Sequence, residues 1–356
     1  MKKITACIAA LFFVFLCGCG TKHPANEYQR FSTVFYDTFD TVVQVIGCCK
    51  SEEEFTGYAE TIKDRFTELN NLYDIYYEYS GINNIKTINN NAGIAPVEVS
   101  DEILDLMDFC LEWYDKTGGQ VNIALGPVTS IWHSYMQRYA GDSSDAKIPD
   151  LEKLLAAKPF CDISKVIVDH DKKTVYLAEE GMSLDVGAVA KGYAAELVCR
   201  EMYDAGFTSF VISAGGNVVA LDAPADGSRA AWGVGIQDPF DAGKAIDTAY
   251  VTNTCVVTSG DYQRYYMAGE QRIHHIIDPA TLMPSDYYRG VTVITEDSGI
   301  ADLASTTLFT LPYEESRALA EKMGWKALWV FADGSIELTD DMIPLLKERG
   351  NADKKV

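Results

Sequence analysis

Basic side chains are scarce in this sequence of 356 residues: 30 lysines and arginines stand against 52 aspartates and glutamates, which gives a net charge of −22. Nucleic-acid binding depends on neutralising phosphates with lysine and arginine, so we expect no nucleic-acid partner. The same negative field opposes the phosphates of a dinucleotide. A site for such a ligand therefore needs a local cation, which favours a bound metal ion over a basic patch.

Cysteine pairs of the zinc-binding kind are also missing. None of the nine cysteines belongs to a Cys-x-x-Cys motif, which argues against a zinc site. Cys110 and Cys199 fall in helix-like apolar patterns, and we expect both to be buried free thiols. The sequence alone assigns no disulfide pairs.

The chain contains no Pro- or Ser-rich linker and no repeat at the spacing of solenoid proteins. Its first apolar run, residues 4–16, is too short for a comfortable membrane span and follows the positive start Met1-Lys-Lys. That run ends in Leu16-Cys17-Gly18-Cys19, which resembles the processing site of bacterial lipoproteins. The resemblance implies cleavage before Cys19 and acylation of its sulfur; the alternative is an ordinary secretory signal.

These features predict four segments. Residues 1–18 are a signal peptide, 19–30 a lipidated tether, 31–345 one interwoven domain of one or two lobes, and 346–356 a polar tail. Lipid chains at Cys19 would hold the protein at the cell membrane, on its extracytoplasmic face.

Hydrophobic periodicity predicts an α+β fold, because strands and packed helices mix without strict alternation. Residues 51–73, 191–205, 301–311 and 313–323 have helical patterns. Strands are expected within residues 31–46 and at 210–213, 232–236, 249–258 and 290–294, and hairpins are expected at 166–177 and 327–338.

The most informative segment is Ser183-Leu-Asp-Val-Gly-Ala-Val-Ala-Lys-Gly-Tyr-Ala194, which begins like a strand and ends like a helix. Such a turn directs backbone N–H groups and a helix N-terminus at one spot, which suits a phosphate. Lys191 adds a positive charge, and Asp185 adds an acceptor for a sugar hydroxyl or an amine. The alternative is that Gly187 and Gly192 only allow a helix to pack closely on a sheet.

Two later segments, His274-His-Ile-Ile-Asp-Pro-Ala-Thr281 and Ala301-Asp-Leu-Ala-Ser-Thr-Thr-Leu308, follow at a characteristic spacing. Gly215-Gly216-Asn217 and Ser259-Gly260-Asp261-Tyr262 lie between them. In this order the segments resemble the ApbE family of flavin transferases, from about residue 34 to about residue 329. The resemblance implies an ApbE-like mixed sheet and transfer of the FMN moiety of FAD to a threonine or serine hydroxyl, with release of AMP.

The resemblance also implies a Mg²⁺ site. Asp302 and Thr306 are four residues apart on an expected helix and so share one face. Carboxylate, hydroxyl and carbonyl oxygens are hard ligands that suit Mg²⁺. In the family the matching acid and hydroxyl bind the ion together with a carbonyl from the turn at Ala188. Without the resemblance, the pair would be an ordinary helix acid and a threonine bonded to its own helix.

His275 is the expected catalytic base, because the family's histidine before the Ile-Ile/Leu-Asp-Pro segment lies near the flavin diphosphate. Strand alternation would point His274 to the opposite side. Asp278 is expected to cap the turn rather than to contact substrate. Ile276 is assigned, with Asp185 and Lys191, to the set that contacts FAD.

Five further residues, in three segments, are assigned to FAD binding by resemblance. Phe39 replaces the methionine of a family Met-Gly-Thr segment, which here lacks its glycine. Tyr79 stands where the family often has an aromatic packed on a ring of FAD, although core packing is an equal alternative. Gln120, Val121 and Asn122 replace a family Ala-Phe-Asp; Asn122 keeps the oxygen but loses the charge, which weakens a direct role for a carboxylate there.

The family implies an acceptor of one kind, an extracytoplasmic redox subunit such as those of Rnf or Nqr complexes. Two alternatives remain at this stage. One is an FAD-binding lipoprotein with Mg²⁺-dependent FAD pyrophosphatase activity, and the other is a solute-binding lipoprotein that performs no chemistry.

Overall fold

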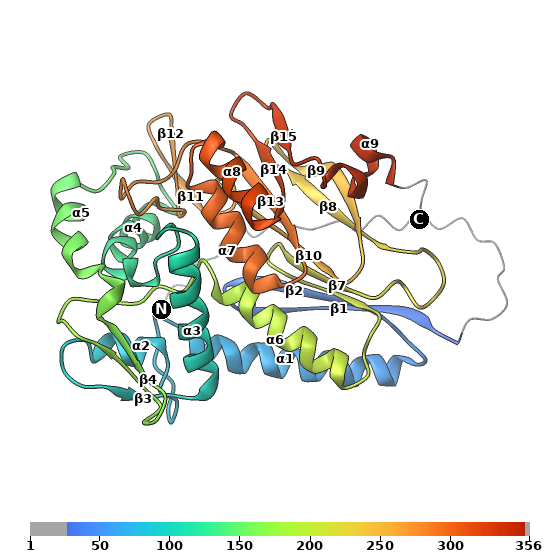
Figure 1. Ribbon diagram of the computed structural model, residues 1–356, viewed down its shortest axis with the longest axis horizontal. Helices are drawn as coiled ribbons and strands as arrows, with labels where there is room; N and C mark the ends of the chain where they lie inside the picture. The colour runs from blue at the N-terminus through green and yellow to red at the C-terminus, as the bar shows by residue number, and fades with distance from the viewer. Residues whose placement is uncertain (1–26, 353–356) are drawn as a thin grey trace.

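The computed structural model describes residues 27–352 and is built around an eight-stranded antiparallel sheet (Figure 1). The strand order is β1-β2-β6-β7-β10-β13-β14-β15, so strands of other sheets intervene in the sequence after β2, after β7 and after β10. The strands are β1 (Gln29–Thr38), β2 (Thr41–Cys49), β6 (Phe210–Ala214), β7 (Asn217–Leu221), β10 (Thr254–Gly260), β13 (Gly290–Thr295), β14 (Lys326–Val330) and β15 (Ile336–Leu338).

Both faces of this sheet are buried, because alternate residues of the central strands enter two different clusters. In β6, Phe210 and Ile212 face one cluster, whereas Val211 between them faces the other. The first cluster is covered by α1 (Glu52–Tyr73), α6 (Ala190–Asp204) and α7 (Ser298–Phe309), and α8 (Tyr313–Met323) lies beside α7. The second is covered by the ribbon of β8 (Trp232–Asp238) and β9 (Asp241–Val251), with α9 (Lys347–Gly350) against it.

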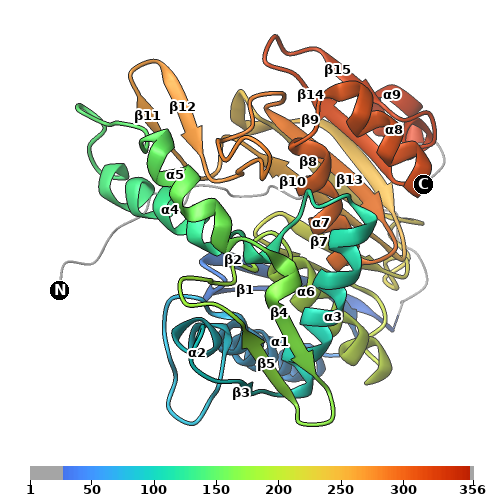
Figure 2. The ribbon, with the colours of Figure 1, turned by 60° about the vertical axis from the view of Figure 1, so that its left-hand side comes forward.

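The remaining elements gather at one end of the sheet (Figure 2). The hairpin of β11 (Tyr265–Ala268) and β12 (Gln271–His274) packs against α4 (Gly126–Tyr139) through an apolar cluster that includes Trp132 and Tyr266. The other members are α2 (Ile85–Asn90), α3 (Asp101–Lys116), α5 (Leu151–Ala157) and the small sheet of β3 (Val97–Glu98), β5 (Thr174–Leu177) and β4 (Val166–Asp169).

The expected α+β class is confirmed, and so are most of its elements. One expected strand, residues 249–258, is wrong: β9 ends at Val251 and β10 begins at Thr254, because Asn253 takes a left-handed conformation with φ 52°. Cys110 and Cys199 are buried free thiols as expected.

The expected boundary at residue 345 also needs correction. Leu346 is completely buried and bridges Ala249 of β9, and Ala352 is buried as well, so residues 346–352 belong to the domain rather than to a polar tail. The signal peptide, Cys19 and most of the expected tether lie outside the described residues. Within residues 27–352, none of the helices has the length and apolar character needed to cross a bilayer.

Candidate active site

The turn that leads into α6 meets α7 at very short range. A Cβ added at Gly192 would lie 2.4 Å from the Cβ of Asp302 and 2.3 Å from the carbonyl oxygen of Ser298. Only glycine permits this approach, because real Cβ atoms do not come so close to other atoms. Gly192 thus allows close packing, against a helix rather than against the sheet that the packing alternative expected, and it brings the start of α6 to the acid of α7.

Asp302 is the central group of this contact. It is 4% exposed, its Oδ2 accepts the N–H of Gly192 at 2.9 Å, and the Nζ of Lys191 lies 3.6 Å from the same oxygen. Gly192 is the third residue of α6, so its N–H is one of the first donors of the helix, which have no partner within it. The carboxylate of Asp302 satisfies this donor.

Thr306 lies one turn after Asp302 on α7, and its hydroxyl contacts β10. Its Oγ1 is 3.2 Å from the Oγ of Ser259, which is also 2.8 Å from the Oγ of Ser305. The expected Ser259–Tyr262 segment therefore reaches the site through Ser259. The hydroxyls of Thr306, Ser305 and Ser259 and the carboxylate of Asp302 therefore place four side-chain oxygen groups on or beside α7.

These groups fit a hard divalent cation. Asp302 supplies a buried carboxylate and Thr306 a hydroxyl, and Ala188 lies in the turn just before the α6 residue whose N–H binds Asp302, so its carbonyl could complete the set. The candidate site contains only one acidic side chain, so it is not a metal site built from several acids, cysteines or histidines. Among residues 27–352, no group of three or more His, Cys, Asp or Glu side chains could hold a metal ion.

The two adjacent histidines have opposite surroundings, as strand alternation predicts. His274 is 3% exposed, and its Nε2–H donates to the Ser285 carbonyl at 2.6 Å while its Nδ1 accepts the N–H of Ile276. His275 is exposed. Its Nδ1–H donates to the Arg264 carbonyl at 3.3 Å, which leaves Nε2 as the free acceptor nitrogen.

The environment keeps His275 neutral although its side chain reaches solvent. Desolvation by the protein atoms around it, followed by the positive charge of Arg264, lowers the pKa of His275 to about 3. The charge of Lys191 acts in the same direction. His275 and Lys191, from separate elements, are therefore electrostatic neighbours.

Two carboxylates hold the segments around His275 in place. Asp278 caps its turn, as expected, by accepting the N–H of Ala280 and the hydroxyl of Thr281. Asp261 is 1% exposed and pairs with Arg272 of β12 and with Arg289 before β13. Asp261 thus ties the hairpin that precedes His275 to the large sheet.

Asp185 lies on the side of the turn that faces α4. Its Oδ1 accepts the N–H of Gly187 at 2.9 Å and its Oδ2 accepts the hydroxyl of Thr129 at 2.6 Å. Phe39 and Asp40 form the turn between β1 and β2, with φ angles of 50° and 49°. The carbonyl of Asp40 accepts a hydrogen bond from Arg264, which places the glycine-free turn next to the segment of His275.

The other residues expected to contact FAD make contacts within the protein. Asn122 uses both ends of its amide, accepting from the N–H of Ala124 and donating to the carbonyl of Cys161. The Tyr79 hydroxyl donates to Asp74, and Gln120 accepts from Thr310. Val121 and Ile276 are buried at 5% and 6% exposure. For Asn122, Val121 and Ile276 the geometry shows a structural role.

The sequence did not single out Thr129, Tyr76, His133 or Arg264. Thr129 and His133 are one turn apart on α4, and this spacing could have marked a common helix face. No sequence signal points to Tyr76, which is one tyrosine among several after α1. Arg264 acts through its backbone carbonyl as much as through its charge, and a carbonyl carries no sequence signature.

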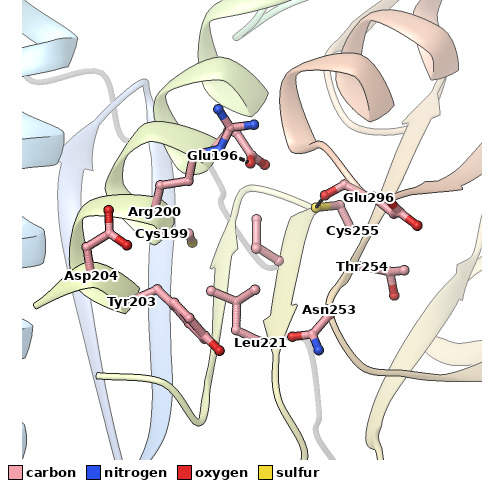
Figure 3. A pocket seen from close by; sticks show the side chains of 11 residues that line it. Glu196, Cys199, Arg200, Tyr203, Asp204, Leu221, Asn253, Thr254, Cys255 and Glu296 are labelled. Atoms are coloured by element: carbon pink, nitrogen blue, oxygen red, sulfur yellow. Dashed lines mark hydrogen bonds and ion pairs between the residues drawn. The ribbon is translucent and has the colours of Figure 1, made fainter. Parts of the chain in front are cut away.

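A cavity of about 390 Å³ lies elsewhere, between the C-terminal half of α6 and the ends of β7 and β10 (Figure 3). None of the expected site residues lines it. Its most buried acid, Glu196, accepts the N–H of Ser298 and pairs with Arg200. Burial raises the pKa of the Cys199 and Cys255 thiols well above the ordinary value, so neither is a ready nucleophile.

Comparison with protein families adds an independent line of evidence. A family model, the ApbE family, matches residues 39–329. The FAD:protein FMN transferase of Treponema pallidum is 30% identical over 345 residues, which cover 92% of each chain. The protein of the same name from Escherichia coli K12 is 26% identical and covers 93% of each chain.

Solved structures agree with the fold. The ApbE protein of Thermotoga maritima superposes with a TM-score of 0.78 at 25% identity, covering 89% of this chain and 99% of that one. The flavin transferase ApbE of Vibrio cholerae gives a TM-score of 0.75 at 20% identity, with the same coverage, and supports the fold alone.

Proposed function

The chain belongs to the ApbE family, and from this premise we propose that it is a transferase that moves the FMN moiety of FAD onto a protein hydroxyl, with Mg²⁺ bound at Asp302, Thr306 and the Ala188 carbonyl. One observation supports the proposal most strongly. The first turn of α6 and the acid of α7 meet at Gly192, and the charge of the preceding residue, Lys191, acts on the neutral His275. A positive charge that could bind phosphate and a neutral imidazole that could accept a proton thus lie close enough to interact.

Each residue of the site would have its own role in phosphoryl-type transfer, a reaction in which positioning and charge neutralisation dominate. When bound, Mg²⁺ would offset negative charge that develops on the diphosphate. Lys191, held 3.6 Å from Asp302, provides a second positive charge for the phosphates. Asp185, fixed by Thr129 and the N–H of Gly187, is a rigid acceptor beside them.

His275 would take the proton. The acceptor hydroxyl oxygen forms a bond to the FMN phosphorus as the bond between that phosphorus and the bridging oxygen of AMP breaks. The hydroxyl proton passes to Nε2 of His275, because Nδ1–H is occupied by the Arg264 carbonyl. A free-state pKa of about 3 makes His275 a weak base, and the negative diphosphate would raise that pKa toward neutrality.

The setting of the reaction is part of the proposal. The lipoprotein-like Leu16-Cys17-Gly18-Cys19 would anchor the protein through Cys19 on the extracytoplasmic face of the cell membrane. The acceptor would then be a threonine or serine on an extracytoplasmic redox subunit, of the Rnf or Nqr type or a similar flavinylated protein.

The test mixes protein lacking residues 1–19 with FAD, Mg²⁺ and such an acceptor domain. We expect fluorescent flavin that stays on the acceptor through denaturing electrophoresis, and no label when the metal is chelated. The variant His275→Ala should lose labelling by about 10²- to 10⁴-fold, the usual contribution of a general base, while FAD still binds. Normal labelling by this variant would overturn the assignment of the base.

A second activity, hydrolysis of FAD to FMN and AMP, is favoured by the exposure of His275, because water can reach the nitrogen that would activate the hydroxyl. Release of AMP without any acceptor would reveal it. If AMP is released rapidly and the acceptor stays unlabelled, the protein is a pyrophosphatase.

A further inference from the structure

One buried asparagine of the large sheet has no partner for its side-chain NH₂ group. Asn217, the first residue of β7, is 2% exposed, and its Nδ2 makes no hydrogen bond to any of residues 27–352. An unsatisfied buried donor costs free energy, because it has lost its hydrogen bonds to water and gained none in return. Such donors are rare in folded proteins, so this one requires an explanation.

A second buried asparagine shows the usual arrangement. Asn84 is completely buried, and both ends of its amide are bonded within the protein. Its Oδ1 accepts the N–H and the hydroxyl of Thr87, and its Nδ2 donates to the carbonyls of Asn71 and Tyr77. These bonds stabilise the fold. The Nδ2 group of Asn217 makes no such contribution, so this donor is available to a molecule that binds beside it.

Asn217 lies on the face of the sheet that α6 and α7 cover (Figure 1). Strand alternation places its side chain on the same side as Val219, which belongs to the core cluster beneath these helices. On β10, Val257 pairs with Asn217, and Ser259 is two residues further on and so faces the same side. Diagonal neighbours of this kind lie roughly 7–8 Å apart. Ser259 contacts the hydroxyl of Thr306 at 3.2 Å, so the free donor is close to the candidate metal site.

The two-residue turn before Asn217 fixes its position. Gly215 and Gly216 have φ angles of 60° and 99° and connect β6 to β7. Positive φ angles at both positions are typical of tight hairpin turns. The N–H of Gly215 donates to the carbonyl of Val42, which ties this turn to β2. The backbone that carries the amide is therefore held in place before any ligand binds, and binding requires no ordering of this segment.

We propose that the Nδ2 group of Asn217 donates a hydrogen bond to a phosphate oxygen of the bound dinucleotide. This inference rests on the proposed function, since it assumes that the diphosphate lies at Asp302 and Thr306. A hydrogen bond to a charged phosphate oxygen is stronger than one between neutral groups. An amide donates its N–H groups without exchanging a proton. Asn217 would therefore bind and orient the substrate and would take no part in the proton transfer.

The experiment measures the Kd for FAD, for ADP with Mg²⁺ and for riboflavin, without acceptor. ADP contains the diphosphate without the flavin, and riboflavin contains the flavin without phosphate. Asn217→Leu keeps the branched shape and removes the donor, and Asn217→Ala removes it with a smaller side chain. Both variants should bind FAD and ADP about tenfold to a hundredfold more weakly, the range for a lost bond to a charged group, and should bind riboflavin as the wild type does.

Thr292→Val is the matched control. Thr292 of β13 is 1% exposed, and its hydroxyl is bonded at 2.8 Å to that of Thr258, on the opposite face of the sheet from Ser259. This variant also replaces a buried polar group by an apolar one. It should lower the unfolding midpoint and leave FAD affinity unchanged. Asn217→Leu should weaken FAD binding without lowering the midpoint, because its Nδ2 has no protein partner to lose.

The ligands also decide against the inference if it is wrong. Wild-type affinity of both Asn217 variants for FAD and ADP would overturn it and leave the proposed function intact. Weaker riboflavin binding with unchanged ADP binding would overturn it as well, since the amide would then contact the flavin. Failure of the wild-type protein to bind FAD would overturn both the inference and the proposed function.

Discussion

At the scale of single residues, the contrast between His274 and His275 shows how position decides chemistry. Both are histidines at consecutive positions, yet His274 has both nitrogens bonded inside the protein and His275 keeps Nε2 free. Period-two alternation of the strand was enough to predict which one faces out. The lowered pKa of His275 could not be predicted, because it depends first on desolvation by the surrounding protein atoms and then on charges such as that of Arg264.

The titration of His275 is a direct prediction. In the free protein its imidazole should stay neutral well below pH 6.5, with a pKa of about 3. Addition of FAD should raise this pKa, because a negative diphosphate favours the imidazolium. An NMR pH titration of the ring proton signals, assigned with His275→Gln, measures both values. A free-state pKa near 6.5 would contradict the account of its environment.

At the scale of elements, the approach of α6 to α7 forms the candidate metal site. The sequence motif predicted a turn followed by a helix and a separate helix with Asp302 and Thr306, and both are present. It could not show that Gly192 is the point of contact, since a glycine near a helix start has several uses. Resemblance assigned Asn122 to FAD, and the structure adds a role that the sequence did not predict: its amide caps a short helix at residues 123–125 and donates to the Cys161 carbonyl.

Substitution of Gly192 tests this contact. Gly192→Ala should force α6 and α7 apart, lower the free energy of unfolding by about 1–3 kcal/mol and sharply reduce labelling, because overpacking displaces Asp302. Gly57→Ala is the control: Gly57 lies within α1, where an added Cβ meets nothing within 4 Å. That substitution should stabilise the protein by about 0.5–1 kcal/mol. Chemical unfolding and the labelling assay are the measurements. Equal stability and activity of Gly192→Ala would refute the contact.

At the scale of the whole molecule, pH should act on stability through histidines that the fold keeps neutral. Burial lowers the pKa of His133 and of His274, and desolvation lowers that of His275. Below pH 6.5 the unfolded chain binds protons that the folded protein does not bind, so the free energy of unfolding should fall as the pH falls. Carboxylates with lowered pKa, such as Asp226, contribute in the same direction only at lower pH.

Urea unfolding at pH 7.5 and at pH 5.5 measures this dependence. The wild-type protein should be less stable at pH 5.5, and the loss should be smaller in His275→Ala, which lacks one of the neutral histidines. Equal stability at the two pH values would show that these histidines protonate in the folded state.

At this scale, the sequence predicted the class of the fold but not the arrangement of its strands and helices. The short apolar run at residues 210–213 predicted the strand β6, but the strand order of the large sheet follows from pairings between residues far apart in sequence. The helical end of the molecule, with Tyr76 and His133 brought together from residues 57 positions apart, has no local signal. Long-range contacts of this kind arise from packing of the complete chain.

The most direct test of the central claim is the intact mass of an acceptor domain after incubation with the protein, FAD and Mg²⁺, measured together with the AMP released. The account predicts that the acceptor gains the mass of one FMN phosphoester, that one AMP appears for each FMN attached, and that both products disappear with His275→Ala. An acceptor of unchanged mass, with FAD bound and the metal present, would contradict it.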